Sequence, residues 1–275
     1  MSYYRPDTLT DALQIIAKGT GQVIAGGTDV YPAGKPGQGP AWYLDVTNVA
    51  ELRGITLADE GVLIGAAVTW SELIAADLPP AFDALKAAGR EVGSVQIQNA
   101  GTLAGNLCNA SPAADGVPAL LALDASVDLA STSRGVRRVA LAEFITGVRR
   151  TDLGADEIVT GIHIPPVPGS MTSAFGKLGS RRYLVISICM TAVNLDLDAR
   201  GVIRDARIAV GACSAVAQRL TQLEQEIIGK RPQEVVLTDA HLSVLSPIDD
   251  VRGSAAYRLE AAREQVARVL HEAAG

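Results

Sequence analysis

Side chains for metal chemistry are scarce in this chain of 275 residues. It has 3 cysteines and 3 histidines, all far apart, and no CxxC pair; they are Cys108, Cys189, Cys213, His163, His241 and His271. Zinc and iron–sulfur sites need several such ligands at set spacings. We therefore expect no metal site in this chain, and the dispersed histidines give little support to a Ser–His–Asp triad. Cys189 lies in the apolar run "YLVISICM", which predicts a buried small side chain.

Long apolar runs and clusters of basic residues are also missing. No run approaches the roughly 20 apolar residues of a membrane span, and the start, "MSYYRPDTLTDAL", lacks the apolar core of a signal peptide. The formal net charge is −6 and the basic residues are scattered, which argues against nucleic acid or an anionic membrane as a partner. With 48% hydrophobic and 20% charged residues, we expect a soluble globular protein of the cytoplasm.

Apolar spacing predicts alternating helices and strands. In the first part we expect a helix over 7–19, strands at 22–27 and 41–48, two strands around an acidic turn within 54–73, a helix over 79–93 and a helix followed by a strand over 116–131. The proline-rich stretch "HIPPVPGSMTS" at 163–173 predicts a domain boundary. After it we expect strands at 183–198 and 202–214 and helices at 217–229 and 254–274.

Two glycine-containing stretches share a character that suggests a common ligand. They are "QVIAGGTDV" at 22–30 and "IQNAGTLAGNLCNASPAADG" at 97–116. Glycine lets a backbone come close to another group, and consecutive free N–H groups form a concave nest that binds a diphosphate without lysine. The fingerprints GxGxxG and GxxxxGK[ST] are absent, which argues against a Rossmann domain or a kinase-like site. Either stretch alone is equally explained as a tight turn.

In four motifs the chain resembles the FAD-binding medium subunit of the molybdenum hydroxylases, the group of the xanthine dehydrogenases and the aerobic carbon monoxide dehydrogenases. The motifs are "AGGTDV" at 25–30, the stretch 97–116, "KLGSRRYLVIS" at 177–187 and "DDVRGSAAYR" at 249–258. They occur in the family's order, and the resemblance covers nearly the whole chain. It implies an α+β fold: a two-part FAD-binding domain of the vanillyl-alcohol-oxidase type over 1–167, with subdomains of about 1–53 and 54–167, then a small C-terminal domain over 168–275 with a short antiparallel sheet and packed helices.

The resemblance also implies which residues hold FAD. The family's first loop falls on Val23, Ile24, Ala25, Gly26, Gly27, Thr28, Asp29 and Val30. Backbone N–H groups of residues 25–29 would hold the pyrophosphate, with the Thr28 hydroxyl as a further donor. The second loop, 101–106, would place Gly101, Thr102, Ala104, Gly105 and Asn106 against the pyrophosphate and ribityl chain. Ala104 stands where the family usually has glycine, and Gln98 where a basic residue is common.

Outside the two loops, the resemblance gives roles to single residues. Asp115 would accept hydrogen bonds from the ribose or adenine side of FAD, although it is also a candidate helix N-cap. Ile158 and Val159 match positions that pack on the cofactor, which a buried strand explains equally well. Lys177 matches a lysine near the isoalloxazine edge, where a cation stabilises developing negative charge, and Tyr183 lies near an aromatic position beside the flavin. Neither loop has a histidine or cysteine for covalent attachment, and we expect Cys108 to point into packing and the FAD to be non-covalent.

The implied function is electron transfer within a larger enzyme, with no catalytic residue beyond the flavin. In the family, substrate is hydroxylated on a large molybdopterin-binding subunit, and electrons pass through [2Fe–2S] clusters of a small subunit to this FAD and then to NAD⁺, oxygen or another carrier. The assembly is an αβγ heterotrimer or its dimer. Three alternatives stay open: a self-contained flavin reductase such as the enolpyruvyl-UDP-N-acetylglucosamine reductases, a flavin-free assembly scaffold, and an α/β protein that binds another phosphate ligand.

Overall fold

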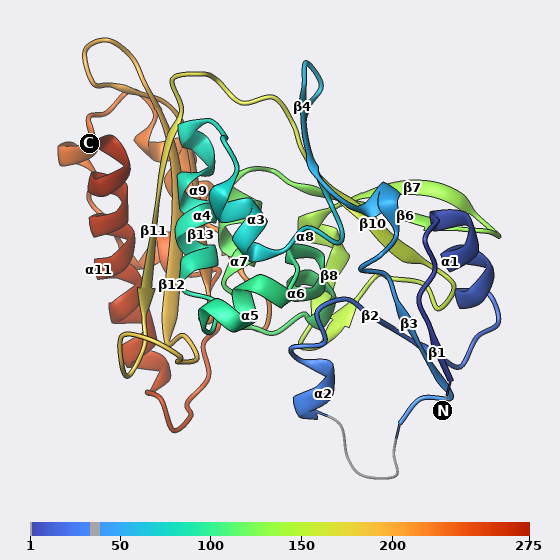
Figure 1. The fold of residues 1–275 in the computed structure, drawn as a ribbon. Helices are drawn as coiled ribbons and strands as arrows, with labels where there is room; N and C mark the ends of the chain where they lie inside the picture. The colour runs from blue at the N-terminus through green and yellow to red at the C-terminus, as the bar shows by residue number, and fades with distance from the viewer. Residues whose placement is uncertain (1, 34–38) are drawn as a thin grey trace.

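The computed structural model describes residues 2–33 and 39–275, which form an α+β structure (Figure 1). The chain begins with a small parallel sheet in the order β1-β3-β2. Its strands and helices are β1 (Ser2–Tyr4), α1 (Leu9–Ile16), β2 (Gln22–Ile24), α2 (Val30–Ala33), β3 (Trp42–Asp45) and the 3-10 turn η1 (Ala50–Leu52). Thr8 caps α1 by accepting a hydrogen bond from the backbone N–H of Asp11. The predicted first helix and the two strands after it are thus confirmed.

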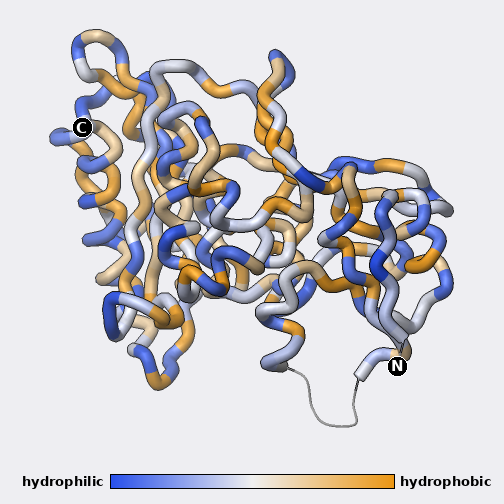
Figure 2. Tube along the Cα trace, in the orientation of Figure 1, coloured by the Kyte–Doolittle hydropathy of each residue, from blue (hydrophilic) through white to orange (hydrophobic). Residues whose placement is uncertain are grey.

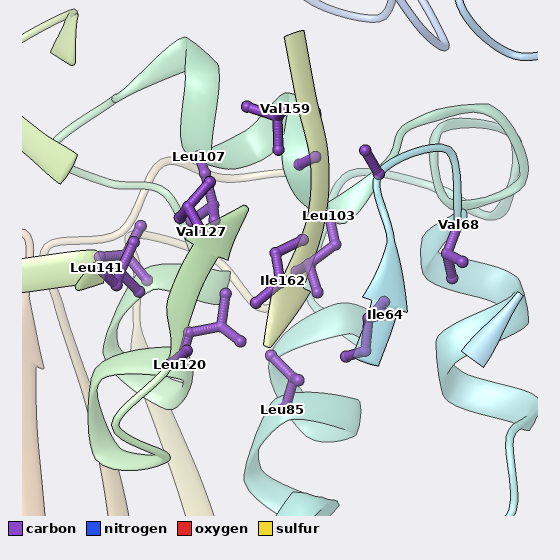
Figure 3. Close-up of a cluster of buried hydrophobic side chains, with 14 of the residues drawn as sticks. Ile64, Val68, Leu85, Leu103, Leu107, Leu120, Val127, Leu141, Val159 and Ile162 are labelled. Carbon is purple, nitrogen blue, oxygen red and sulfur yellow. The ribbon is translucent and has the colours of Figure 1, made fainter. Parts of the chain in front are cut away.

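A larger antiparallel sheet follows, in the order β4-β5-β10-β6-β7. Its strands are β4 (Ile55–Ala58), β5 (Gly61–Gly65), β6 (Ser126–Ser131), β7 (Gly135–Ala140) and β10 (Ile158–Ile164). Between them lie α3 (Trp70–Ala75), η2 (Pro80–Phe82), α4 (Asp83–Arg90), α5 (Val95–Ala100), α6 (Leu103–Asn109), α7 (Gly116–Ala122), α8 (Leu141–Phe144), β8 (Ile145–Gly147) and β9 (Arg150–Thr151). Leu103 and Leu107 of α6 and Leu120 of α7 pack with Val127 and Ile162 of the sheet (Figure 3).

The C-terminal part is an antiparallel sheet in the order β11-β12-β13-β14. Its elements are β11 (Thr172–Leu178), β12 (Cys189–Leu197), β13 (Ile203–Gly211), β14 (Gln218–Arg219), α9 (Thr221–Ile227), η3 (Pro232–Glu234), α10 (Asp239–Leu242) and α11 (Ala255–Ala274). Helix α11 covers one face of this sheet, and α4 and α7 pack on the other (Figure 1). Polar and apolar residues alternate along α11 (Figure 2), and Ala262, Val266 and Val269 are buried at helical spacing.

Three stretches differ from their predicted structure. The helix expected from 217 begins only at Thr221, because Gln218 and Arg219 form β14 and pair with β13. The strand expected from 183 begins only at Cys189, because the backbone before it turns: Leu184 has a φ of +51° and its carbonyl accepts a hydrogen bond from the Arg181 guanidinium. The stretch 97–116 is largely helical and not a polar loop. Ser94 and Thr102 cap α5 and α6 by accepting hydrogen bonds from backbone N–H groups. Local side-chain caps therefore convert a glycine-containing run into two short helices.

Over the described ranges, no helix is both long enough and apolar enough to cross a membrane.

Candidate cofactor site

The two glycine-containing stretches meet in space, backbone against backbone. An ideal Cβ on Gly26 would lie 1.8 Å from the carbonyl oxygen of Ala100 and 2.8 Å from the backbone nitrogen of Gly101. In the opposite direction, a Cβ on Gly101 would lie 3.3 Å from Thr28 Oγ1. Gly27 has a φ of +67°, a conformation that favours glycine. The loop after β2 is therefore seated on the junction between α5 and α6, which no residue with a side chain at position 26 would allow.

The second stretch supplies fewer free donors than predicted. The N–H of Gly105 donates to Thr102 Oγ1 at 3.0 Å, and the N–H of Asn106 donates to the Thr102 carbonyl at 3.1 Å. Both are bonds of the first turn of α6, so these two N–H groups are not available to a pyrophosphate. The Asn106 side chain faces α7, where a Cβ on Gly116 would lie 3.2 Å from its Oδ1. The placing of Gly105 and Asn106 against the pyrophosphate and ribityl chain stays a prediction, and these two backbone N–H groups would not be its donors.

A cavity of about 410 Å³ lies beside this contact, and we call it cavity A. Among the predicted residues, it is lined by Val23, Ala25, Thr102, Ala104, Gly105, Ile158 and Val159. The volume is in the range of small-molecule sites, and the lining combines apolar side chains with backbone. The structure thus brings together residues from both loops and from β10. A more open hollow of about 490 Å³ is lined by Gly26 and Ala100 themselves, together with Arg5, Arg53 and Thr102 among others.

One wall of cavity A was missed by the sequence reasoning. The segment 153–157 precedes β10, and all its residues except Asp156 line the cavity. Glu157 holds this segment in place: its buried carboxylate accepts the N–H of Gly154 at 2.7 Å and two guanidinium bonds from Arg137 at 2.7 and 2.8 Å. The guanidinium of Arg137 lowers the pKa of Glu157. In the sequence, this segment shows only a turn with glycine and aspartate before a strand. Such a turn does not indicate that Glu157 pairs with Arg137 on β7.

Cys108 lies in cavity A and does not point into packing as expected. Cys108 is an exposed residue, and desolvation by the protein atoms around it raises the pKa of its thiol above the ordinary value. Such a thiol stays protonated near neutral pH, and it is the thiolate that reacts.

Asp115 and Lys177 form a buried ion pair between α7 and β11. Lys177 Nζ lies 3.0 Å from the Asp115 carboxylate, and the Ser187 hydroxyl donates to Asp115 Oδ1 at 3.0 Å. Lys177 Nζ also donates to the carbonyl of Glu91 at 3.2 Å. The two side chains are 12% and 7% exposed, respectively. Burial raises the pKa of Asp115, while Lys177 and Ser187 act in the opposite direction. Asp115 therefore makes no side-chain cap, and Lys177 is not a solvated surface lysine.

This pairing is incompatible with two of the predicted roles taken together. Asp115 was expected at the ribose or adenine side of FAD and Lys177 at the isoalloxazine edge. In an extended FAD these ends are separated by the diphosphate and the ribityl chain, so one ion pair cannot serve both. Neither residue lines cavity A, whereas Ile158 and Val159 do. The structure therefore separates the predicted residues into a group at cavity A and a group at the C-terminal sheet.

The remaining predicted residues lie around the first loop or outside the site. Ile24 is buried in β2, Asp29 is exposed and Val30 begins α2. Tyr183 is 60% exposed on the segment before β12, with the Arg182 guanidinium 5.3 Å from its ring centroid. In the part of the chain that the structure describes, no group of three or more His, Cys, Asp or Glu side chains is arranged to hold a metal ion.

Comparison with known proteins defines the class of this chain as an FAD-binding component of an oxidoreductase. Two family models match nearly the whole chain: the FAD binding domain in molybdopterin dehydrogenase over residues 1–167, and the CO dehydrogenase flavoprotein C-terminal domain over residues 174–273. The chain therefore belongs to the FAD-binding subunits of the molybdenum hydroxylase family, as its four motifs predicted. FAD is its cofactor, and the α+β fold expected from the resemblance is confirmed.

Similar proteins align over almost their full length. The xanthine dehydrogenase FAD-binding subunit of Escherichia coli O157:H7 is 33% identical over 281 residues, covering 99% of this chain and 95% of that protein. The nicotine 6-hydroxylase medium subunit of Paenarthrobacter nicotinovorans is 32% identical over 283 residues, covering 98% and 96%. Among solved structures, the reconstituted CO dehydrogenase from Oligotropha carboxidovorans superposes with a TM-score of 0.87 at 26% identity, covering 100% of this chain and 97% of that one.

Proposed function

We propose that this chain carries electrons inside a molybdenum-containing hydroxylase, from [2Fe–2S] clusters of a small partner subunit to NAD⁺, oxygen or another acceptor. A large molybdopterin-binding subunit would carry the hydroxylation site. The family description names molybdopterin dehydrogenases, and one relative is named a medium subunit of a hydroxylase, which supports an assembly of this kind. The observation that carries the proposal is the backbone contact between Gly26 and Ala100, because it builds a site from both family loops. These two residues line the open hollow, and their neighbours Ala25 and Thr102 line cavity A.

The residues present fit FAD. The absence of a side chain at Gly26 and the positive φ of Gly27 allow the first loop to present backbone N–H groups at close range, which suits a diphosphate. We assign the pyrophosphate to residues 25–29 with the Thr28 hydroxyl, and the adenosine part to cavity A, where Ala104, Ile158 and Val159 supply apolar contacts. The ribityl and isoalloxazine part would then lie toward Asp115 and Lys177.

When bound, FAD supplies the redox chemistry, and the side chains of this chain supply position and charge. The ammonium group of Lys177 is held by Asp115 and the Glu91 carbonyl, and it would supply a fixed cation to stabilise negative charge on the bound flavin. Glu157 and Arg137 keep the wall of cavity A in place. Neither the loop at 23–30 nor the loop at 101–106 contains a histidine or cysteine to which the flavin could be attached, so we propose that FAD is bound non-covalently.

We also propose that the chain divides near residue 167 into an FAD-binding domain, itself of two parts meeting near residue 53, and a C-terminal domain over 168–275. Two separate clusters of buried apolar side chains support this division: one gathers mainly residues before 171, and the other lies entirely after 173. The ion pair between Asp115 and Lys177 crosses the boundary.

Reconstitution tests the proposal. The chain is expressed alone, loaded with FAD and assayed with purines, aldehydes and N-heterocycles and a dye acceptor, then assayed again with the molybdenum and iron–sulfur subunits added. We expect bound FAD that is released by acid denaturation, and substrate turnover only with the partners. Turnover by the lone chain would instead favour a self-contained flavin reductase, and a colourless complex purified without FAD would favour a scaffold.

A further inference from the structure

The motif "DDVRGSAAYR" at 249–258 contains a buried guanidinium that the cofactor site does not explain. Arg258 lies in the first turns of α11 and is 2% exposed. Its Nη1 donates to the carbonyl of Ile188 at 2.6 Å and to that of Ala212 at 3.1 Å, and its Nη2 donates to Asp250 Oδ1 at 2.7 Å. Ile188 directly precedes β12, and Ala212 directly follows β13. One side chain therefore joins the ends of two neighbouring strands to the loop before α11.

Both strand ends contact the segment that leads to Asp115. Next to Ile188, the hydroxyl of Ser187 donates to Asp115 Oδ1 at 3.0 Å. The N–H of Ala212 donates to the carbonyl of Pro112 at 3.0 Å. Arg258 thus binds Ala212 itself and the neighbour of Ser187, and these two residues make the hydrogen bonds that position the segment 112–115. These contacts link the C-terminal motif to the buried ion pair by two independent routes.

The contacts of Arg258 cost more free energy than a purely structural role would require. Arg258 Nε is buried without a hydrogen-bond partner among the described residues, and Ala212 has a φ of +62°. A buried guanidinium requires several polar partners, and apolar residues of similar volume often stabilise a core equally well. Its advantage is geometric, because its donors lie in one rigid plane and can hold two carbonyls in a fixed relation. Asp250 is in turn held by the backbone N–H and the guanidinium of Arg252, each at 2.8 Å.

We propose that Arg258, oriented by Asp250, is a positioning residue of the flavin site. It holds Ser187 and the segment 112–115 so that the Asp115–Lys177 pair is set for the ring end of FAD. This inference rests on the proposed role of Asp115 and Lys177. It assigns a task to the C-terminal motif, whose residues line neither cavity A nor the hollow beside Gly26.

Arg258→Lys is the informative variant, because it keeps the charge and removes the planar fork. Arg219→Lys is the matched control: Arg219 also bridges the two domains, with Nη1 on the Leu121 carbonyl at 2.9 Å and Nε on Glu224 at 2.5 Å, but at the opposite end of α7. Three properties are measured on each purified protein: the FAD dissociation constant from flavin fluorescence, amide hydrogen exchange of apo-protein peptides covering 187–190 and 210–213, and the reduction potential of the bound flavin.

We expect Arg258→Lys to raise the FAD dissociation constant about tenfold, the effect of losing one hydrogen bond to a charged group. It should also speed exchange of the Ala212 amide and lower the flavin potential, because the Lys177 cation is less firmly placed. Arg219→Lys should lower the melting temperature without these three effects. Equal changes in both variants, or no change in Arg258→Lys, would overturn the proposal. If Arg258→Lys does not fold, Asp250→Asn replaces it. We then expect a smaller rise in the FAD dissociation constant, and an unchanged dissociation constant would contradict the proposal.

Asp115→Asn separates this inference from the site on which it rests. If Asp115→Asn leaves the FAD dissociation constant unchanged, the proposed site at Asp115 is wrong. If Asp115→Asn weakens FAD binding while Arg258→Lys does not, the site stands and the role of Arg258 is refuted.

Discussion

Gly26 and Ala100 are in direct backbone contact, so close that a Cβ on Gly26 would lie 1.8 Å from the Ala100 carbonyl oxygen. This contact joins two residues that are 74 positions apart in the sequence, and the first prediction follows from it. In Gly26→Ala, the loop must move away from the α5–α6 junction, with overpacking that costs about 1 to 3 kcal/mol. We expect loss of FAD binding together with a lower melting temperature, measured by flavin content and thermal unfolding.

Gly169→Ala is the control for that variant, because a Cβ at position 169 meets no atom within 4 Å and the backbone there has no positive φ. Full flavin content in Gly26→Ala would show that the contact is dispensable for the site.

The second prediction concerns the buried ion pair. Lys177→Met leaves the Asp115 carboxylate buried without its counter-charge, and breaking such pairs costs about 3 to 5 kcal/mol. The double variant Lys177→Met/Asp115→Asn should recover part of this loss, which urea unfolding of the apo-proteins measures.

Burial already raises the pKa of Asp115, and removing Lys177 raises it further. A group whose folded pKa is raised stabilises the protein below its unfolded pKa and loses that contribution as pH rises.

The stability of Lys177→Met should therefore fall as pH increases from about 4 toward neutrality, more steeply than that of the double variant. Parallel pH profiles for the two proteins would contradict the assignment of the buried charge to Asp115.

The third prediction is acid sensitivity at the C-terminal motif. The N–H of Arg252 and the guanidinium of Arg258 lower the pKa of Asp250 from 3.8 to about 2. A lowered folded pKa means that the stabilisation is present above the unfolded value and is lost as pH falls through the folded value. Wild-type protein should therefore lose stability between about pH 4 and pH 2 more steeply than Asp250→Asn. Asp59→Asn, in the exposed turn between β4 and β5, is the control and should follow the wild-type profile.

The fourth prediction concerns Cys108, which lies open in cavity A with a thiol pKa raised to about 12. Because only the thiolate reacts, alkylation by iodoacetamide should be slow at neutral pH and should accelerate steadily as pH rises to 10. Cys108→Ser identifies the signal, since Cys189 and Cys213 are buried. Loading with FAD should slow the reaction further, because cavity A is the proposed adenosine site. Rapid labelling at neutral pH would contradict the raised pKa, and labelling unaffected by FAD would move the adenosine elsewhere.

Much of the fold could be predicted from the sequence because its signals are local. The helix beginning after Thr8, the strands at 22–24 and 42–45 and the long C-terminal helix all follow from apolar spacing and caps within a few residues. The order of the four motifs likewise predicted the family, FAD and the α+β fold. Where local chemistry was misjudged, as at Thr102, a capping hydroxyl made a helix of an expected loop.

Only the tertiary structure decided how the site is assembled. The sequence by itself determined that two glycine-containing stretches follow apolar segments and that Asp115 and Lys177 are present. It did not determine that they pair, because residues 62 positions apart meet only when α7 packs on the C-terminal sheet. The same holds for Glu157 with Arg137 and for Arg258 with the ends of β12 and β13. The spacing of charged residues along a helix or strand does not indicate which residue will be the partner of a charge. A buried charge needs a partner, and burial arises only from the packing of the whole chain.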